Sequence, residues 1–167
     1  LPYRWQLVIG RQLGKLFCQL SPGRRHITDT NLSLCFPELD ASAREKIREE
    51  QFASLGIGVL EMALSWWGTD RQLKKLARIE GLEHLHRALD QGKGVILLSG
   101  HFTTLEIGGR LLSRVAPFHV MYRPHKNVAF ESVLRKSRTR HFEKAIPRGD
   151  LRGMLKSLKQ NIPVWYA

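Results

Sequence analysis

The sequence predicts an α/β fold in which a helical N-terminal half leads into a mostly parallel or mixed sheet flanked by helices. In the first 92 residues, apolar side chains recur near helical spacing in several segments. From residue 93 onward, short apolar runs bounded by glycine, proline or polar residues alternate with helical patterns. Strands interleaved with helices in this way imply right-handed crossovers and parallel pairing.

Length and composition are those of an ordinary folded protein with an excess of positive charge. The 167 residues include 43% hydrophobic and 25% charged residues, so a single packed domain spanning 1–167 is the simplest organisation. Within it we distinguish a helical part at 1–92 and an α/β part at 93–167. A net charge of +12 predicts attraction to polyanions, namely nucleic acid, anionic lipid or an acidic protein.

The helical part reads as a series of helices separated by breakers. Ser42 and Glu45 form a capping-box pattern at the start of the longest helix. Cys18 and Cys35 lie on apolar segments without metal-ligand spacing, and we expect both to be buried free thiols. The first helix is basic and amphipathic, and it fits either an anionic membrane surface or an ordinary solvated face. The predicted helices are 3–20, 26–34, 44–67 and two short ones within 70–91, divided near Gly81.

The α/β part predicts three strands and three helices. Asp150 is well placed to cap the last of these helices. The strands are expected at 95–98, 118–122 and 164–166, and the helices at 103–114, 127–140 and 150–159.

His101 lies where the first of these strands ends and a helix is about to begin, an edge at which ligands collect in open α/β sheets. In one regular helix, Glu106 would point about 140° away from it. His101 must therefore lie in the turn before the helix if a first-turn carboxylate is to reach the imidazole. Such a carboxylate would orient the ring and leave its other nitrogen as a general base, although one His–Glu pair can also arise by chance.

The sequence around this pair contains no serine nucleophile motif. Ser99 lacks the Gly-x-Ser-x-Gly pattern of a nucleophile elbow. A His–Glu pair without a nucleophile suits direct transfer, in which the base deprotonates an acceptor hydroxyl that attacks the carbonyl of a thioester donor. Backbone N–H groups around His101 are plausible donors to the oxyanion.

The stretch Gly100–Glu106 resembles the His-x-x-x-x-Asp/Glu box of the glycerolipid acyltransferase superfamily. Its surroundings more specifically resemble the lipid A biosynthesis acyltransferases, the late lauroyl/myristoyl-type enzymes of Gram-negative bacteria. Matching stretches follow in the family's order over almost the whole chain, at Asn31–Glu38, Met121–Pro124, Arg148–Met154 and Ile162–Ala167.

The resemblance implies an acyltransferase that moves a fatty acyl chain from acyl carrier protein, the co-substrate, to a hydroxyl of a Kdo-lipid A precursor. It implies His101 as the general base and Glu106 as its orienting partner, with no metal and no cofactor. The expected partners are acyl carrier protein, a phosphorylated glycolipid acceptor and an anionic membrane surface, with no nucleic acid. The expected location is the cytoplasmic face of the bacterial inner membrane.

The substrate-binding residues implied by the resemblance lie between the end of the second predicted strand and the start of the last predicted helix. Arg123 emerges at the same sheet edge as His101, and its planar guanidinium suits phosphate. Tyr122 and Asn127 flank it, and Arg148 is the further candidate. Residues 123–159 contain 11 Lys or Arg and 3 Asp or Glu, so much of the positive charge lies beside the expected site.

Two alternatives remain at the level of the sequence. One is a basic nucleic-acid-binding module, and the other is a glycerophospholipid acyltransferase of the same superfamily. The resemblance also leads us to expect a membrane anchor that is not in this chain. We further expect an acyltransferase fold that is incomplete at its C-terminus, so that the 167 residues alone would be inactive and poorly soluble.

Overall fold

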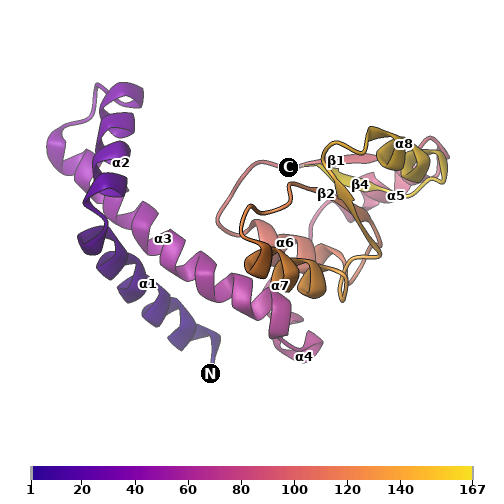
Figure 1. Ribbon diagram of the computed structural model, residues 1–167, viewed down its shortest axis with the longest axis horizontal. Coiled ribbons are helices and arrows are strands. Elements are labelled where there is room, and N and C mark those ends of the chain that lie inside the picture. The colour runs from indigo at the N-terminus through magenta and orange to yellow at the C-terminus, as the bar shows by residue number, and fades with distance from the viewer. Residues whose placement is uncertain (1, 167) are drawn as a thin grey trace. The chain divides into compact units, whose positions relative to one another are not determined.

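The computed structural model describes residues 2–166, and the chain divides into two compact units between Leu64 and Ser65. The first unit contains helices α1 (Tyr3–Leu20), α2 (Pro22–Cys35) and most of α3 (Ala41–Trp67) (Figure 1). The second unit contains the sheet and also the short helices that precede it. The boundary that the sequence predicts at residue 92, between the helical part and the α/β part, therefore falls inside the second unit. None of the helices in residues 2–166 combines the length and the apolarity that crossing a membrane requires.

Helices α1 and α3 of the first unit pack with their backbones almost in contact. Gly10 and Gly14 of α1 are buried against α3. A Cβ atom added to Gly56 of α3 would lie 2.0 Å from the carbonyl oxygen of Gly10. The rings of Phe17 and Phe52 continue the contact, with centroids 5.8 Å apart. Small residues are therefore required where the two helices cross.

Asp40, rather than the predicted capping box, caps helix α3. The carboxylate of Asp40 accepts a hydrogen bond from the backbone N–H of Ala43 at 2.7 Å, so the helix begins at Ala41. The capping-box prediction is wrong because Ser42 and Glu45 already lie inside the helix. Glu45 instead pairs with Arg48, three residues later on the same helix.

Two further predictions for the first unit need correction. Helix α2 starts at Pro22, earlier than the predicted residue 26, because proline fits the first helical position, where no N–H is needed. Both cysteines are free, but only Cys18 is half-buried and Cys35 is exposed. The expectation of two buried thiols is therefore wrong for Cys35, which lies at the end of α2.

The elements of the second unit follow the predicted alternation with one addition. Gly81 adopts the left-handed conformation (φ 78°) between the two short helices, where the sequence predicted a division. Strand β3 was not predicted. The helices are α4 (Asp70–Leu73), α5 (Leu82–Leu89), α6 (Leu105–Leu112), α7 (Val128–Arg138) and α8 (Leu151–Lys159); the strands are β1 (Ile96–Leu98), β2 (His119–Tyr122), β3 (Lys144–Pro147) and β4 (Val164–Tyr166).

The strands form one parallel sheet in the order β1-β4-β2-β3. Strand β4, the last in sequence, lies between β1 and β2, with Val164 paired to both Ile96 and His119. The predicted α/β class is confirmed, and every pairing among the described strands is parallel. Strand β3 was missed because only Ile146 is fully buried in it and it ends in Pro147, which an edge strand tolerates.

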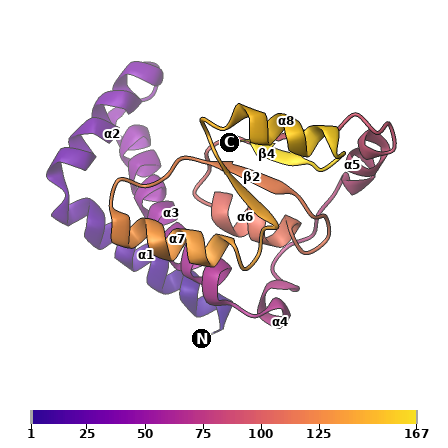
Figure 2. The same ribbon diagram turned by 45° about the vertical axis from the view of Figure 1, so that its right-hand side comes forward.

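The two faces of the sheet are covered by different helices (Figure 2). Helix α8 packs on the face that carries Met121, Ile146 and Val164, and its residues Met154 and Leu158 complete that core. Helices α6 and α7 lie on the other face. Asp150 caps α8 as predicted, because its carboxylate accepts the N–H of Gly153 at 2.8 Å.

A buried polar contact joins the sheet to α8. His119 is 6% exposed, and its Nδ1 lies 2.7 Å from the hydroxyl oxygen of Ser157. The Ser157 hydroxyl donates to the carbonyl oxygen of Gly153 at 3.0 Å, so it accepts the Nδ1 proton of the imidazole. Burial lowers the pKa of His119, the nearby Glu143 carboxylate opposes that shift, and Lys144 adds to it.

Candidate active site

His101 lies in the turn that connects β1 to α6. The Ser99 N–H donates to the carbonyl oxygen of Tyr166 at 2.9 Å, which extends the pairing of β1 with β4. Helix α6 begins at Leu105, so His101 is outside the helix and Glu106 is in its first turn. This is the placement that the five-residue spacing required.

A pocket of about 240 Å³ opens at this edge of the sheet and brings together most of the predicted site residues. His101, Glu106, Tyr122 and Arg123 all line it. Apolar and aromatic side chains form much of the remaining wall, contributed by Leu105, Phe118, Val120, Phe142 and Trp165. The pocket therefore combines a cationic and acid–base side with an apolar side.

The carboxylate of Glu106 is bound on both of its oxygens. Oε1 forms an ion pair with Arg138 of α7, and the two side chains are 17% and 16% exposed. Oε2 accepts a hydrogen bond from the indole Nε1–H of Trp66 at 3.5 Å. Among residues 2–166, no hydrogen bond or ion pair joins His101 to Glu106, so the orienting role of Glu106 stays a prediction.

Arg138 is a site residue that the sequence analysis did not single out. It lines the pocket, and its guanidinium carbon lies 5.7 Å from the centroid of the Tyr122 ring. In the sequence it is one of several cations in a basic run, and nothing local separates it from its neighbours. Only the packing of α7 against α6 shows that Arg138, rather than a neighbouring cation, lines the pocket and pairs with Glu106.

The remaining predicted residues take different positions. Asn127 caps α7, because its side-chain oxygen accepts the N–H of Phe130 at 3.0 Å, and this contact accounts for it structurally. Arg148 is exposed and is not part of the pocket wall. Its backbone N–H donates to the Tyr122 carbonyl oxygen at 2.8 Å, so it belongs to the same sheet edge. No cluster of three potential metal ligands occurs within the described part of the chain.

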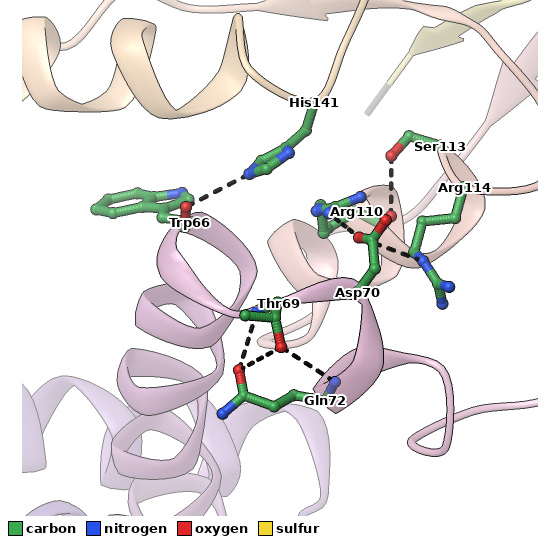
Figure 3. Close-up of polar contacts among 8 residues, drawn as sticks. All are labelled: Trp66, Thr69, Asp70, Gln72, Arg110, Ser113, Arg114 and His141. Carbon is green, nitrogen blue, oxygen red and sulfur yellow. Dashed lines mark hydrogen bonds and ion pairs between the residues drawn. The ribbon is translucent and has the colours of Figure 1, made fainter.

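Within the second unit, polar contacts hold the segment that follows Trp66 against α6 (Figure 3). Thr69 and Gln72 form a reciprocal capping box at the start of α4. Asp70 forms ion pairs with Arg110 of α6 and with Arg114, which follows the end of that helix. The capping box and these ion pairs fix the chain just after Trp66.

His141 contacts this segment from the end of α7. Its Nε2 lies 3.4 Å from the backbone carbonyl oxygen of Trp66. Because a carbonyl oxygen can only accept a hydrogen bond, this nitrogen must be the donor. The pKa of His141 is lowered chiefly by burial, while the hydrogen bond to Trp66 opposes that shift.

A parallel sheet with a His-x-x-x-x-Glu sequence at its carboxyl edge, beside an arginine-containing pocket, is the arrangement expected of a glycerolipid-type acyltransferase. Comparison with known proteins makes this specific. The chain belongs to the bacterial lipid A biosynthesis acyltransferase family, whose model matches residues 1–167.

Individual relatives agree with this family. The whole chain is 37% identical to a lipid A biosynthesis palmitoleoyltransferase and 35% identical to a lipid A biosynthesis lauroyltransferase, both from Escherichia coli strain K12. It is 26% identical over 167 residues to the lipid A biosynthesis myristoyltransferase of the same organism. The chain spans about half the length of these relatives, covering 55%, 55% and 52% of them.

Proposed function

We propose that this protein transfers a fatty acyl chain from acyl carrier protein to a hydroxyl group of a Kdo-lipid A precursor. His101 acts as the general base, and Glu106 orients it. The observation that carries the proposal is one pocket that gathers His101, Glu106 and Arg123 at the carboxyl edge of a parallel sheet, in a chain of the lipid A acyltransferase family.

The proposed chemistry needs no covalent enzyme intermediate. His101 removes the proton from the acceptor hydroxyl, and the oxygen attacks the thioester carbonyl of the donor. The C–S bond then breaks, the thiol of the carrier takes up the proton, and the ester remains on the lipid. Each oxygen of the Glu106 carboxylate has two lone pairs, so it can accept from Arg138 and still face the imidazolium.

The two sides of the pocket suit the two parts of a lipid substrate. Arg123 is exposed at the pocket wall and enters no ion pair among the described residues, so its guanidinium is available to a phosphate on the acceptor. Phe118, Phe142 and Trp165 offer an apolar surface to an acyl chain. Tyr122 also lines the pocket, and its ring faces the guanidinium of Arg138.

The basic surface of residues 123–159 suits the acidic acyl carrier protein that we propose as donor. Lys126, Arg135, Lys136 and Arg140 are all exposed, and none forms an ion pair within residues 2–166. Unpaired cations around a pocket speed the approach of an anionic partner through long-range attraction. Arg148, at the same edge, adds to this field.

We also propose that the protein works on the cytoplasmic face of the inner membrane. Helix α1 supports the part of this proposal that concerns contact with an anionic membrane surface. Only its glycine face is buried against α3, which leaves an apolar stripe exposed. This stripe consists of Trp5, Ile9, Leu13, Leu16 and Leu20, at spacings of three or four residues. The same helix carries Arg4, Arg11 and Lys15 and no acidic residue, as expected for contact with anionic lipid.

The test is acyl transfer by the natural full-length protein. We expect His101→Ala to abolish transfer from acyl carrier protein to the lipid acceptor and Glu106→Gln to reduce it by about 10²-fold or more. His86→Ala, which changes an exposed histidine of α5, is the matched control and should leave transfer unchanged. Normal transfer by a folded His101→Ala protein would refute the proposed mechanism.

A further inference from the structure

We propose that Trp66 is a positioning residue that holds the Glu106 carboxylate opposite Arg138, and that Asp70 anchors the segment on which Trp66 lies. This inference rests on the proposed function, because it concerns how the partner of the general base is held. Trp66 is not part of the pocket wall and acts only through Glu106.

The two contacts on Glu106 do different things. An ion pair to one oxygen fixes the distance to Arg138 but allows the carboxylate plane to rotate. A second donor on the other oxygen removes that freedom. The indole Nε1–H of Trp66 is this donor, and it reaches Oε2 while Arg138 binds Oε1. Together they fix the orientation of the group that is to face His101.

Trp66 needs Glu106 as an acceptor. Trp66 is 7% exposed, and Glu106 is the only partner of its indole N–H within residues 2–166. A buried indole N–H left without an acceptor is unfavourable, so this contact is kept unless the side chain moves. The neighbouring Trp67 is 62% exposed and carries no such constraint.

Packing prevents that movement. The Trp66 ring lies 6.1 Å from the ring of Phe130 on α7 and meets Trp67 edge-on at 5.5 Å. Its backbone carbonyl accepts a hydrogen bond from His141, in the turn after α7. Aromatic contacts of this kind limit the rotation of the indole and therefore the position of its N–H.

The anchor at Asp70 connects Trp66 to the helix that carries Glu106. Asp70 pairs with Arg110, which follows Glu106 by four residues on α6 and so lies on the same face one turn later (Figure 3). Arg114, in the turn after α6, approaches the same carboxylate at 3.5 Å. The ion pair of Asp70 with α6 therefore fixes the position of Trp66 relative to the helix that carries Glu106.

The experiment compares Trp66→Phe with Trp67→Phe in the natural full-length protein. Trp66→Phe removes the N–H and keeps an aromatic ring. We expect it to lower kcat about tenfold, equivalent to about 1.4 kcal/mol, with KM for acyl carrier protein unchanged within a factor of about two. Trp67→Phe makes the same change at the exposed neighbour and keeps an aromatic ring beside Trp66, so both constants should stay unchanged.

A double-mutant cycle separates positioning from general packing. If Trp66 acts through Glu106, Trp66→Phe should have no further effect on the residual transfer of a Glu106→Gln protein. An equal loss of kcat in both backgrounds would show a structural role and overturn the inference. A normal kcat for Trp66→Phe would also overturn it.

Two controls keep the inference distinct from the proposed function. Thermal unfolding is measured for each variant, and Asp70→Asn gives a second perturbation that leaves the indole intact. It should lower kcat in the Glu106 protein and not in the Glu106→Gln protein. Loss of activity in His101→Ala together with full activity in Trp66→Phe and Asp70→Asn would contradict this inference alone. Retained activity in His101→Ala would instead contradict the proposed function.

Discussion

Glu106 of α6 and Arg138 of α7 form an ion pair at the wall of the pocket, with less than a fifth of each side chain exposed. The charge of Glu106 is thus balanced before any substrate or protonated imidazole is present. Two helices that face the sheet are joined through a residue proposed to act in transfer. The pair therefore serves both the packing of the second unit and its chemistry.

Removing the cation should show the contribution of this pair to stability. Arg138→Gln leaves a mostly buried carboxylate without its partner, so we expect the free energy of unfolding to fall by about 2–3 kcal/mol. Arg135→Gln, on the exposed side of the same helix, should change it by less than about 0.5 kcal/mol. Chemical denaturation followed by circular dichroism measures both, and equal effects would contradict a special role for Arg138.

The apolar stripe of α1 should govern membrane binding. Leu16→Glu places a charge within the stripe and should weaken binding to vesicles of phosphatidylethanolamine and phosphatidylglycerol by more than about tenfold. Leu34→Glu makes the same substitution at an exposed leucine of α2, outside the stripe, and serves as control. Vesicle sedimentation measures both. Vesicle binding by Leu16→Glu that equals that of the wild type would show that the stripe of α1 does not contact the membrane.

His119 should make the stability of the fold depend on pH. Because burial lowers its pKa below the usual value of 6.5, the unfolded chain binds more protons in mildly acidic solution. The free energy of unfolding should therefore fall as the pH drops below about 6.5, by at most about 1.4 kcal/mol per pH unit from this group.

The variant His119→Gln should remove that part of the pH dependence. His141, whose pKa is also lowered, will keep a residual slope. His86→Gln, at an exposed position, should leave the whole pH dependence as it is. Urea unfolding at pH 7 and pH 5 gives the comparison. A His119→Gln protein with the full wild-type slope would show that His119 does not carry it.

The helix crossing of the first unit should tolerate no side chain at Gly56. In Gly56→Ala the new methyl group would overlap the carbonyl oxygen of Gly10, so α1 and α3 must move apart, and we expect a loss of at least about 2 kcal/mol of stability. Gly23→Ala is the control, since no atom lies within 4 Å of its added methyl group. Thermal unfolding distinguishes the two, and similar melting temperatures would contradict the close crossing.

The part of the fold that the sequence predicts is the part determined by local patterns. The helix over residues 3–20 and the strand at 164–166 appear with the predicted bounds, because apolar spacing and flanking breakers mark them. Where local signals compete, prediction fails. Ser42 and Glu45 matched a capping box, but Asp40, which precedes both in the sequence, caps the helix instead.

The site divides in the same way. The position of His101 before α6 followed from its spacing to Glu106 and from the glycine-bounded strand before it. Trp66 and Arg138 lie far from Glu106 in sequence, and only the packing of three helices brings them together. Nothing in the local sequence of either residue distinguishes it from Trp67 or Arg135. A contact between distant residues requires the tertiary fold.

Strand β1, which leads into His101, forms its only sheet pairing in the described chain with β4, the strand latest in sequence. The loop that must close to make this pairing includes both β2 and β3, and such non-local contacts form slowly. Among the described strands, β4 is therefore the only neighbour of β1, and it is available only after residues 164–166 have left the ribosome. A nascent chain that ends between Glu106 and Val164 contains the complete His-x-x-x-x-Glu sequence but lacks the neighbouring strand β4.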